Sequence, residues 1–152
     1  MKKGISLVAL IATIVITVIL ISTITISYNG EMSKVSKKTF AKEIYHISTL
    51  VKEYEFLNDT YPTSNKINLN VNSSDFSDEI GYPNILLYEI DLNKLNLNEV
   101  NRGYKKNGEN DVYAISLTTN KVYYLKGFKV NKNIYYSLNN ELEKLLDVGE
   151  VK

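Results

Sequence analysis

Few residues of this chain could carry out catalysis. It contains no cysteine, which excludes a thiol nucleophile, a thiolate metal site and a disulfide. Its one histidine, His46, has no serine and aspartate pattern around it, so we expect a surface or packing role for that side chain. The sequence shows no glycine-rich phosphate loop, zinc-ligand spacing or nucleophile elbow. We therefore expect a protein that is not an enzyme and that holds no cofactor.

Two oxygen-rich stretches are the candidates for a metal site. Their members are Asp75, Asp78 and Glu79 in the first, and Asn107, Glu109, Asn110 and Asp111 in the second. Calcium takes about six to eight oxygen ligands. Neither stretch follows the ligand order of an EF-hand, so we interpret both as solvated loops and expect no metal.

The charges of the chain are close to balanced. It has 18 Lys and Arg against 17 Asp and Glu, with no basic stripe that could follow a phosphate backbone. We expect Lys105 and Lys106, beside Arg102, to lie in a solvated loop. No nucleic-acid partner is indicated.

Tyrosine is frequent, with twelve in the chain. Five of them fall on predicted strands: Tyr113, Tyr123, Tyr124, Tyr135 and Tyr136. Side chains alternate between the faces of a strand, so some of these rings should face the core and others should face outward. Cross-strand packing is the favoured interpretation, and a contact with another subunit is the alternative.

The first thirty residues carry the strongest signal. Lys2, Lys3 and Gly4 precede an apolar run over residues 5–26, and no charge occurs between Lys3 and Glu31. As a helix this run is about 33 Å long, enough to cross a hydrocarbon core of about 30 Å. We therefore expect a leader at residues 1–4 and a single transmembrane helix at residues 5–28. The two lysines favour a cytoplasmic N-terminus, which puts the remaining domain outside the cytoplasm.

Three other interpretations of this segment were weighed. A secretory signal peptide has an apolar region of about 7–15 residues and a small-residue cleavage site, and 25–27 is a poor match to one. A buried helix of a soluble protein would need more covering chain than residues 27–152 provide. An uncleaved signal anchor is the strongest alternative, because hydropathy does not reveal whether Gly4 is processed.

Small and hydroxylated residues form a stripe along the apolar helix. The stripe consists of Ser6, Ala9, Thr13 and Thr17, at spacings of three or four residues. Such stripes allow close helix packing in membranes. An alternative of equal weight is that the serine and threonine hydroxyls donate hydrogen bonds to carbonyl oxygens of their own helix.

The same segment resembles the N-terminus of type IV pilins and type II secretion pseudopilins. The matching positions are Gly4, Ile5, Ser6, Leu7, Val8 and Leu10. In that family a prepilin peptidase cuts after the glycine and the new first residue is methylated, so the resemblance implies processing between Gly4 and Ile5. The family's glutamate, thought to pair with a neighbouring subunit's N-terminal amine, is replaced by Ala9. This departure implies an accessory or tip subunit rather than a bulk one.

Residues 29–60 are expected to continue as an amphipathic helix. Its apolar face repeats every three or four residues through Phe40, Ile44, Ile47, Val51 and Tyr54. Gly30 lowers helix stability by about 1 kcal/mol relative to Ala, which makes it a candidate bend at the membrane surface. Pro62 ends the helix.

Residues 61–152 are expected to form a C-terminal α+β domain. We predict a loop at 63–84 with a short helix near 74–80, strands at 85–90, 112–117, 121–125, 128–130 and 134–138, a helical turn at 91–95, and a final helix capped by Asn139 or Asn140. The expected fold is a long helix packed on a small antiparallel sheet, which is also the pilin architecture. The block at 111–138 also looks like that of prepilin-type proteins from AT-rich Gram-positive bacteria.

These observations predict a structural subunit of a bacterial cell-envelope filament or secretion apparatus. The implied partners are membrane lipid, other pilin or pseudopilin subunits and a prepilin peptidase. The alternative is an uncut, signal-anchored surface protein with a small extracellular binding domain.

Overall fold

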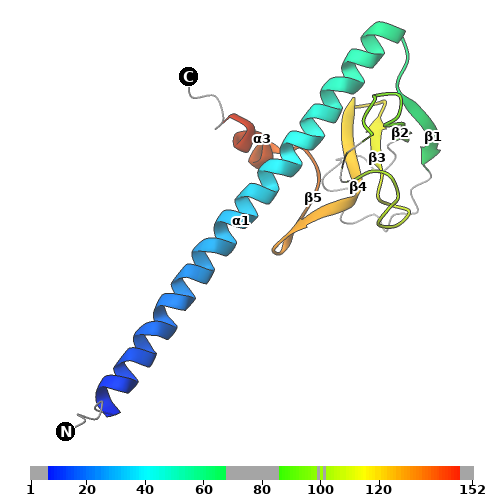
Figure 1. The fold of residues 1–152 in the computed structure, drawn as a ribbon. Helices are drawn as coiled ribbons and strands as arrows, with labels where there is room; N and C mark the ends of the chain where they lie inside the picture. Colours follow the sequence, from blue (N-terminus) through cyan, green and yellow to red (C-terminus); the bar gives the residue numbers. More distant parts are fainter. Residues whose placement is uncertain (1–6, 68–85, 99, 101, 148–152) are drawn as a thin grey trace. The chain divides into compact units, whose positions relative to one another are not determined.

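A computed structural model describes residues 7–67, 86–98, 100 and 102–147, and within the first helix it describes the side chains of residues 11–18 and 30–58. The element order is one long helix, five strands and a short helix (Figure 1). The chain divides into two compact units, Met1–Ser36 and Lys37–Lys152. The second unit holds the C-terminal part of the long helix together with all five strands.

Helix α1 runs without interruption from Leu7 to Asn58. It passes through Asn29 and Gly30, so the chain stays helical at the position where a bend was expected. A single glycine lowers helix stability only modestly, and long helical flanks on both sides offset that loss. The helix ends before Pro62, as expected, with Asp59 at a positive φ of 53°. Over the residues that the structure describes, no helical segment combines the length and the apolar character of a membrane span.

The five strands form one antiparallel sheet in the order β1-β2-β3-β4-β5. Their bounds are β1 Thr63–Ile67, β2 Leu87–Ile90, β3 Tyr113–Ser116, β4 Lys121–Val130 and β5 Asn133–Ser137. The sheet is therefore a meander in which each strand pairs with its neighbours in sequence. This confirms an α+β fold made of a long helix and a small antiparallel sheet.

Two features of the sheet differ from the sequence-based expectation. Strand β1 occupies residues expected to be loop, because its polar sequence carries no alternating apolar signal. The runs at 121–125 and 128–130 form the single strand β4, whose pairing with β5 shifts between Tyr123 and Phe128. Gly127 lies in this irregularity at φ 74°, where a Cβ atom would come within 2.5 Å of Ile134. The helix predicted near 74–80 lies outside the described residues.

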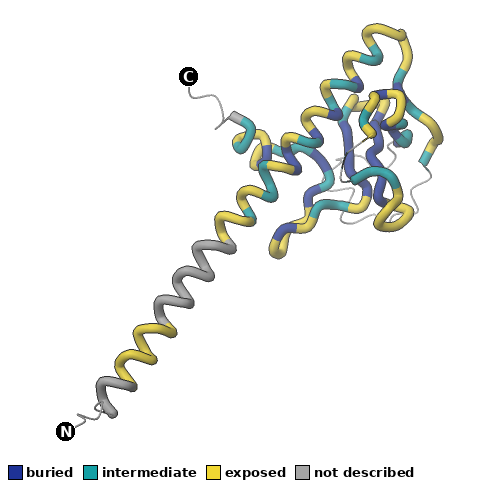
Figure 2. Tube along the Cα trace, in the orientation of Figure 1, coloured by how far each residue is buried: buried dark blue, intermediate teal, exposed yellow. Residues whose placement is uncertain are grey.

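Alternation along the strands divides the core into two clusters. The first packs the C-terminal half of α1 against the sheet and includes Phe40, Ile44, Ile47, Val51, Tyr113, Ile115, Val122 and Tyr124. The second cluster is formed by side chains that point to the opposite face of the sheet, and it includes Leu87, Val112, Ala114, Tyr123 and Leu125. Figure 2 shows the buried residues among those described on α1 in its C-terminal half, where the helix faces the strands. The predicted apolar face of the helix is thereby confirmed as core.

Helix α3, Asn140–Asp147, closes the described chain. The Leu142 amide donates a hydrogen bond of 2.9 Å to Asn139 Oδ1, which confirms Asn139 as the helix cap. Leu142 is fully buried in the first core cluster. Lys37 on α1 pairs with Glu141 at 2.7 Å, so both an apolar and a charged contact hold α3 to the long helix.

A fragment that begins near Glu31 should fold as a soluble monomer, and Ile47→Ala should destabilise it by about 2–5 kcal/mol. Ile47 is fully buried in the first core cluster, so the substitution removes methylene contacts and leaves a cavity. Denaturant unfolding measures the change in the free energy of unfolding. Phe56→Ala is the matched control, because Phe56 lies on the same helix with 88% of its surface exposed. A loss below about half a kcal/mol for Ile47→Ala would mean that this face does not stabilise the core.

Candidate functional site

The residues that the sequence singles out for function lie at the start of the chain. Gly4, Ile5 and Ser6 lie outside the described residues. Ala9 belongs to α1, where the structure describes the backbone of this residue but not its side chain. The structure therefore gives no geometry for the processing junction or for the first half of the stripe. It describes Thr13 and Thr17 from that stripe.

Thr17 shows the local alternative that the sequence left open. Its hydroxyl donates to the Thr13 carbonyl oxygen at 2.8 Å, one helical turn earlier. The apolar neighbours of these threonines are well exposed within the single chain; they are Ile11, Ile14, Val15, Ile16 and Val18, each with at least 50% of its surface accessible. This stretch of α1 thus presents branched aliphatic side chains without cover from the described parts of the chain.

A polar cluster that the sequence did not reveal lies in the second unit. Glu43 of α1 accepts a hydrogen bond from the Tyr113 hydroxyl on β3 and forms an ion pair with Arg102. The Glu43 and Arg102 side chains are only 12% and 19% exposed. The expectation of a solvated loop concerned Lys105 and Lys106, and it did not anticipate the partial burial of Arg102 beside them. Lys105 and Lys106, in contrast, are exposed as expected.

Two aromatic rings lie beside the guanidinium group of Arg102. Its Cζ atom lies 4.7 Å from the centre of the Phe128 ring and 5.7 Å from that of Phe40. The two rings stack on each other with centroids 4.7 Å apart. A planar, weakly hydrated cation suits this position, because it can pair with a carboxylate while its faces contact rings. We call Glu43, Arg102, Tyr113, Phe40 and Phe128 the Arg102 cluster.

Asp111 organises the loop that carries Arg102. Its side chain is fully buried and accepts four hydrogen bonds, from the Gly103 amide, the Asn107 amide, the Asn107 side-chain nitrogen and the Tyr124 hydroxyl. These bonds range from 2.7 to 3.2 Å. Because every one of these partners is a hydrogen-bond donor, the carboxylate has the environment of a satisfied anchor rather than that of a cation ligand.

The calcium candidates therefore separate into two groups. In the second stretch, Asp111 is committed to the loop while Glu109 and Asn110 are exposed. Within the described part of the chain, no group of three His, Cys, Asp or Glu side chains is placed to hold a metal ion. The first stretch, at Asp75, Asp78 and Glu79, lies outside the described residues.

The hydrogen bonds also alter proton affinities in this region. Burial acts to raise the pKa of Asp111, but the bonds from Gly103, Tyr124 and Asn107 outweigh it and hold the pKa below its usual value. Burial, reinforced by a nearby carboxylate, raises the pKa of both Tyr113 and Tyr124 above the normal range. The phenols therefore remain protonated donors and the carboxylate remains an acceptor, which is a structural arrangement rather than an acid–base pair.

A pH dependence of stability follows from Asp111. Its depressed pKa contributes stability that is complete above the unfolded value of about 3.9 and that is lost as the pH falls toward the folded value. Unfolding of the Glu31 fragment should show this decrease as the pH falls below about 4. Asp111→Asn should flatten it, whereas Glu109→Gln, an exposed change in the same loop, should leave it intact. An unchanged slope in Asp111→Asn would contradict the assignment.

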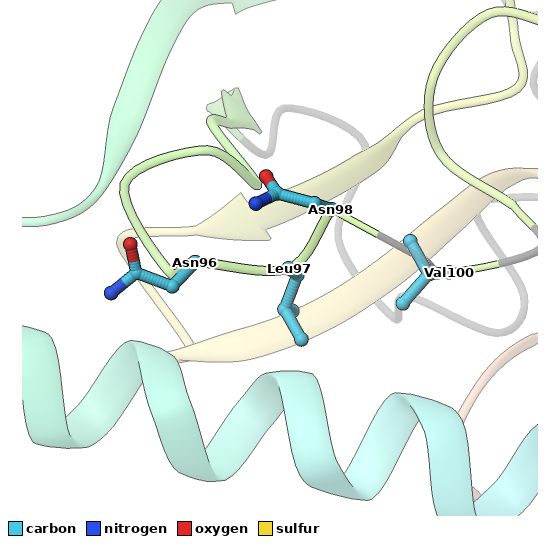
Figure 3. Close-up of a pocket in the computed structure, with 4 residues that line it drawn as sticks. All are labelled: Asn96, Leu97, Asn98 and Val100. Atoms are coloured by element: carbon cyan, nitrogen blue, oxygen red, sulfur yellow. The ribbon is translucent and has the colours of Figure 1, made fainter.

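Two of the hollows on the surface of the second unit are defined by described residues. One, of about 380 Å³, is lined by Asn96, Leu97, Asn98 and Val100. Figure 3 shows the Leu97 side chain directed toward the long helix, while the amide groups of Asn96 and Asn98 extend to the side. Leu97 and Val100 both pack against the first core cluster. None of these four described lining residues carries a titratable side chain.

The other hollow, of about 530 Å³, lies along α1. Its walls include Tyr45 and Lys52 on α1, Lys121 at the start of β4, and Glu143 on α3. It contains no nucleophile with an adjacent base among these residues. His46 is exposed on the same helix, in agreement with its expected surface or packing role.

The sheet tyrosines support the packing interpretation. Tyr113, Tyr123, Tyr124 and Tyr135 are buried, with at most 4% of their surface exposed, and Tyr136 is half-buried. The rings of Tyr113 and Tyr124 lie 5.1 Å apart at 39°, a favourable tilted contact. Cross-strand and helix–sheet packing therefore accounts for four of the five, and these four are not free to form a subunit contact.

Comparisons of this chain with models of known families, with characterised proteins and with solved structures find no match.

Proposed function

We propose that this chain is a minor pilin-like or pseudopilin-like subunit of a cell-envelope filament or secretion apparatus. The observation that carries the proposal is the order of residues after Lys2 and Lys3, where Gly4 is followed directly by Ile5, Ser6 and an uncharged apolar run. A prepilin peptidase would cut between Gly4 and Ile5. The proposal rests on sequence resemblance over residues 2–26.

The fold is compatible with this role. Helix α1 continues from Leu7 to Asn58, and its C-terminal half supplies the main helix face of the core of a small antiparallel sheet domain. Its described apolar residues at 11–18 are exposed in the single chain. A helix of this kind can be held by lipid in a precursor and by neighbouring helices in an assembly.

The proposed sequence of events begins with a single-pass precursor whose two lysines stay in the cytoplasm. Residues 5–28 form its membrane anchor, and residues 61–152 with the adjoining helix lie outside the cytoplasm. Cleavage after Gly4 removes the basic leader. The apolar helix then moves from lipid into a bundle of like helices, where close packing replaces lipid contacts.

The alanine at position 9 is the reason to expect few copies of this subunit in an assembly. A carboxylate inside an apolar bundle is tolerated only when it is paired, so a chain with Ala9 avoids that desolvation and also forfeits the pairing. We expect few copies per assembly, with another subunit supplying the acid. Quantitative mass spectrometry of purified filaments measures the copy number, and a result that made this chain the bulk subunit would contradict the minor role.

The test of the function is the N-terminus of the protein extracted from its native membrane. Peptide mass spectrometry should find a chain that begins at Ile5 with a methylated amine. The competing candidate is an uncut signal-anchored surface protein, which the alanine at position 9 favours. That candidate requires intact Met1 or Lys2 in a cell that has a prepilin peptidase, and such a result would overturn the proposal.

A further inference from the structure

Two asparagine–glycine pairs occur in the chain, Asn29–Gly30 and Asn107–Gly108, and the structure places them in different backbone settings. The first pair lies inside the continuous helix α1. The second lies in the turn between Arg102 and Asp111, where both residues are exposed. This difference matters because an asparagine side chain can react with the amide nitrogen of the residue that follows it.

The turn leaves the Gly108 nitrogen accessible. The nitrogen donates a long backbone hydrogen bond of 3.4 Å to the Lys105 carbonyl oxygen. Gly108 adopts a φ of 116°, and no atom lies within 4 Å of the position where a Cβ would stand. Glycine alone combines this backbone freedom with an unshielded nitrogen.

We propose that Asn107 is a site of spontaneous deamidation. The Gly108 nitrogen, after losing its proton to water or hydroxide, forms a bond to Asn107 Cγ, and the Cγ–Nδ2 bond breaks with release of ammonia. Water then opens the resulting five-membered imide at either carbonyl, which yields aspartate or isoaspartate. No oxidant, reductant or cofactor takes part in either step.

The product would change the environment of Asp111. Asn107 Nδ2 now donates to Asp111 Oδ2 at 3.2 Å, and its backbone amide donates to the same oxygen at 3.1 Å. Deamidation replaces the side-chain donor with a carboxylate, which puts two negative charges side by side in a part-buried position. The hold of Asp111 on the loop should weaken, so the modification acts as a slow, irreversible change in the loop that carries Arg102.

The helical pair provides an internal control. An α-helical backbone fixes the asparagine and commits the following amide to the helix ladder, so the nitrogen cannot easily reach Cγ. We therefore expect Asn107 to convert at least roughly tenfold faster than Asn29 in the folded protein, because only the turn allows that approach.

The experiment follows the full-length protein in detergent micelles, kept in mildly alkaline buffer and sampled over weeks. Peptide mass spectrometry and enzymatic methylation of isoaspartate should both detect the change at Asn107. A denatured sample gives the rate of deamidation at each asparagine in the absence of folded structure. The proposal is overturned if Asn107 stays intact in the folded protein while the denatured sample converts, or if Asn29 converts equally fast.

Two variants test the consequence. Asn107→Gln keeps an amide at the position but should abolish the isoaspartate signal, because the larger ring forms far more slowly. Asn107→Asp imitates one product and should lower the Tm by about 3–6 °C relative to Asn107→Gln, through the lost hydrogen bond and the added charge. Equal Tm values for the two variants would overturn the proposed effect on the Asp111 loop.

Discussion

Gly4→Leu should abolish removal of the leader, so that the whole population of the protein keeps Met1 or Lys2 at its N-terminus. The change puts a bulky branched side chain at the position where a prepilin peptidase would accept glycine. It leaves residues 5–26 untouched, and an added leucine favours insertion of an apolar helix. Membrane extraction should therefore recover the variant in full amount but with the leader attached.

The matched control is Gly30→Ala. Gly30 lies inside α1, and a Cβ added there meets no atom within 4 Å, so the substitution is sterically free. Alanine also favours a helix over glycine by about 1 kcal/mol. Processing of this variant should be normal. Equal N-termini in Gly4→Leu and the unchanged protein, whether both cut or both uncut, would mean that Gly4 does not direct a cleavage.

The helix and its core face could be predicted because their signals are local. Phe40, Ile44, Ile47 and Val51 repeat with the helical period, and all four are fully buried in the structure. Side chains three or four positions apart share one face of a helix whatever else the chain does. The Asn139 cap was predicted for the same reason, since a cap acts within a single turn.

The strands were less predictable where their stability comes from partners rather than from their own residues. Strand β1, Thr63–Ile67, reads as polar loop, yet it pairs with β2 through Thr63 and Ile90 at one end and Ile67 and Leu87 at the other. Such an edge strand needs no apolar alternation, because it forms backbone hydrogen bonds to a neighbour that is already in place. Only the tertiary structure supplies that neighbour.

The Arg102 cluster was missed because its members are far apart in the sequence. Glu43 and Arg102 are separated by 59 positions, so no local sequence pattern connects them. One signal was available: Arg102 is the only arginine in a chain whose other basic residues are lysines. An arginine retained among lysines is typical of a site that needs a planar fork beside a carboxylate and aromatic rings.

Arg102→Ala should lower the free energy of unfolding of the Glu31 fragment by about 3–5 kcal/mol, because it breaks the Arg102 cluster. The substitution leaves the Glu43 carboxylate at 12% exposure without its counter-charge, with only the Tyr113 hydroxyl as a donor in the cluster. It also removes the contacts of the guanidinium with the stacked Phe40 and Phe128 rings. Both losses act on the same helix–sheet contact.

A double-mutant cycle separates the ion pair from the packing. Arg102→Ala leaves the Glu43 carboxylate without its counter-charge, and Glu43→Gln removes that negative charge. The double variant should therefore lose clearly less free energy of unfolding than the sum of the two single variants. Lys105→Ala is the control, since Lys105 pairs with Glu89 on the surface and is 52% exposed, where an ion pair contributes about 0–1 kcal/mol. Additive losses in the cycle would show that Arg102 acts only by filling space. A loss for Arg102→Ala no larger than that for Lys105→Ala would remove the cluster from the stabilising core.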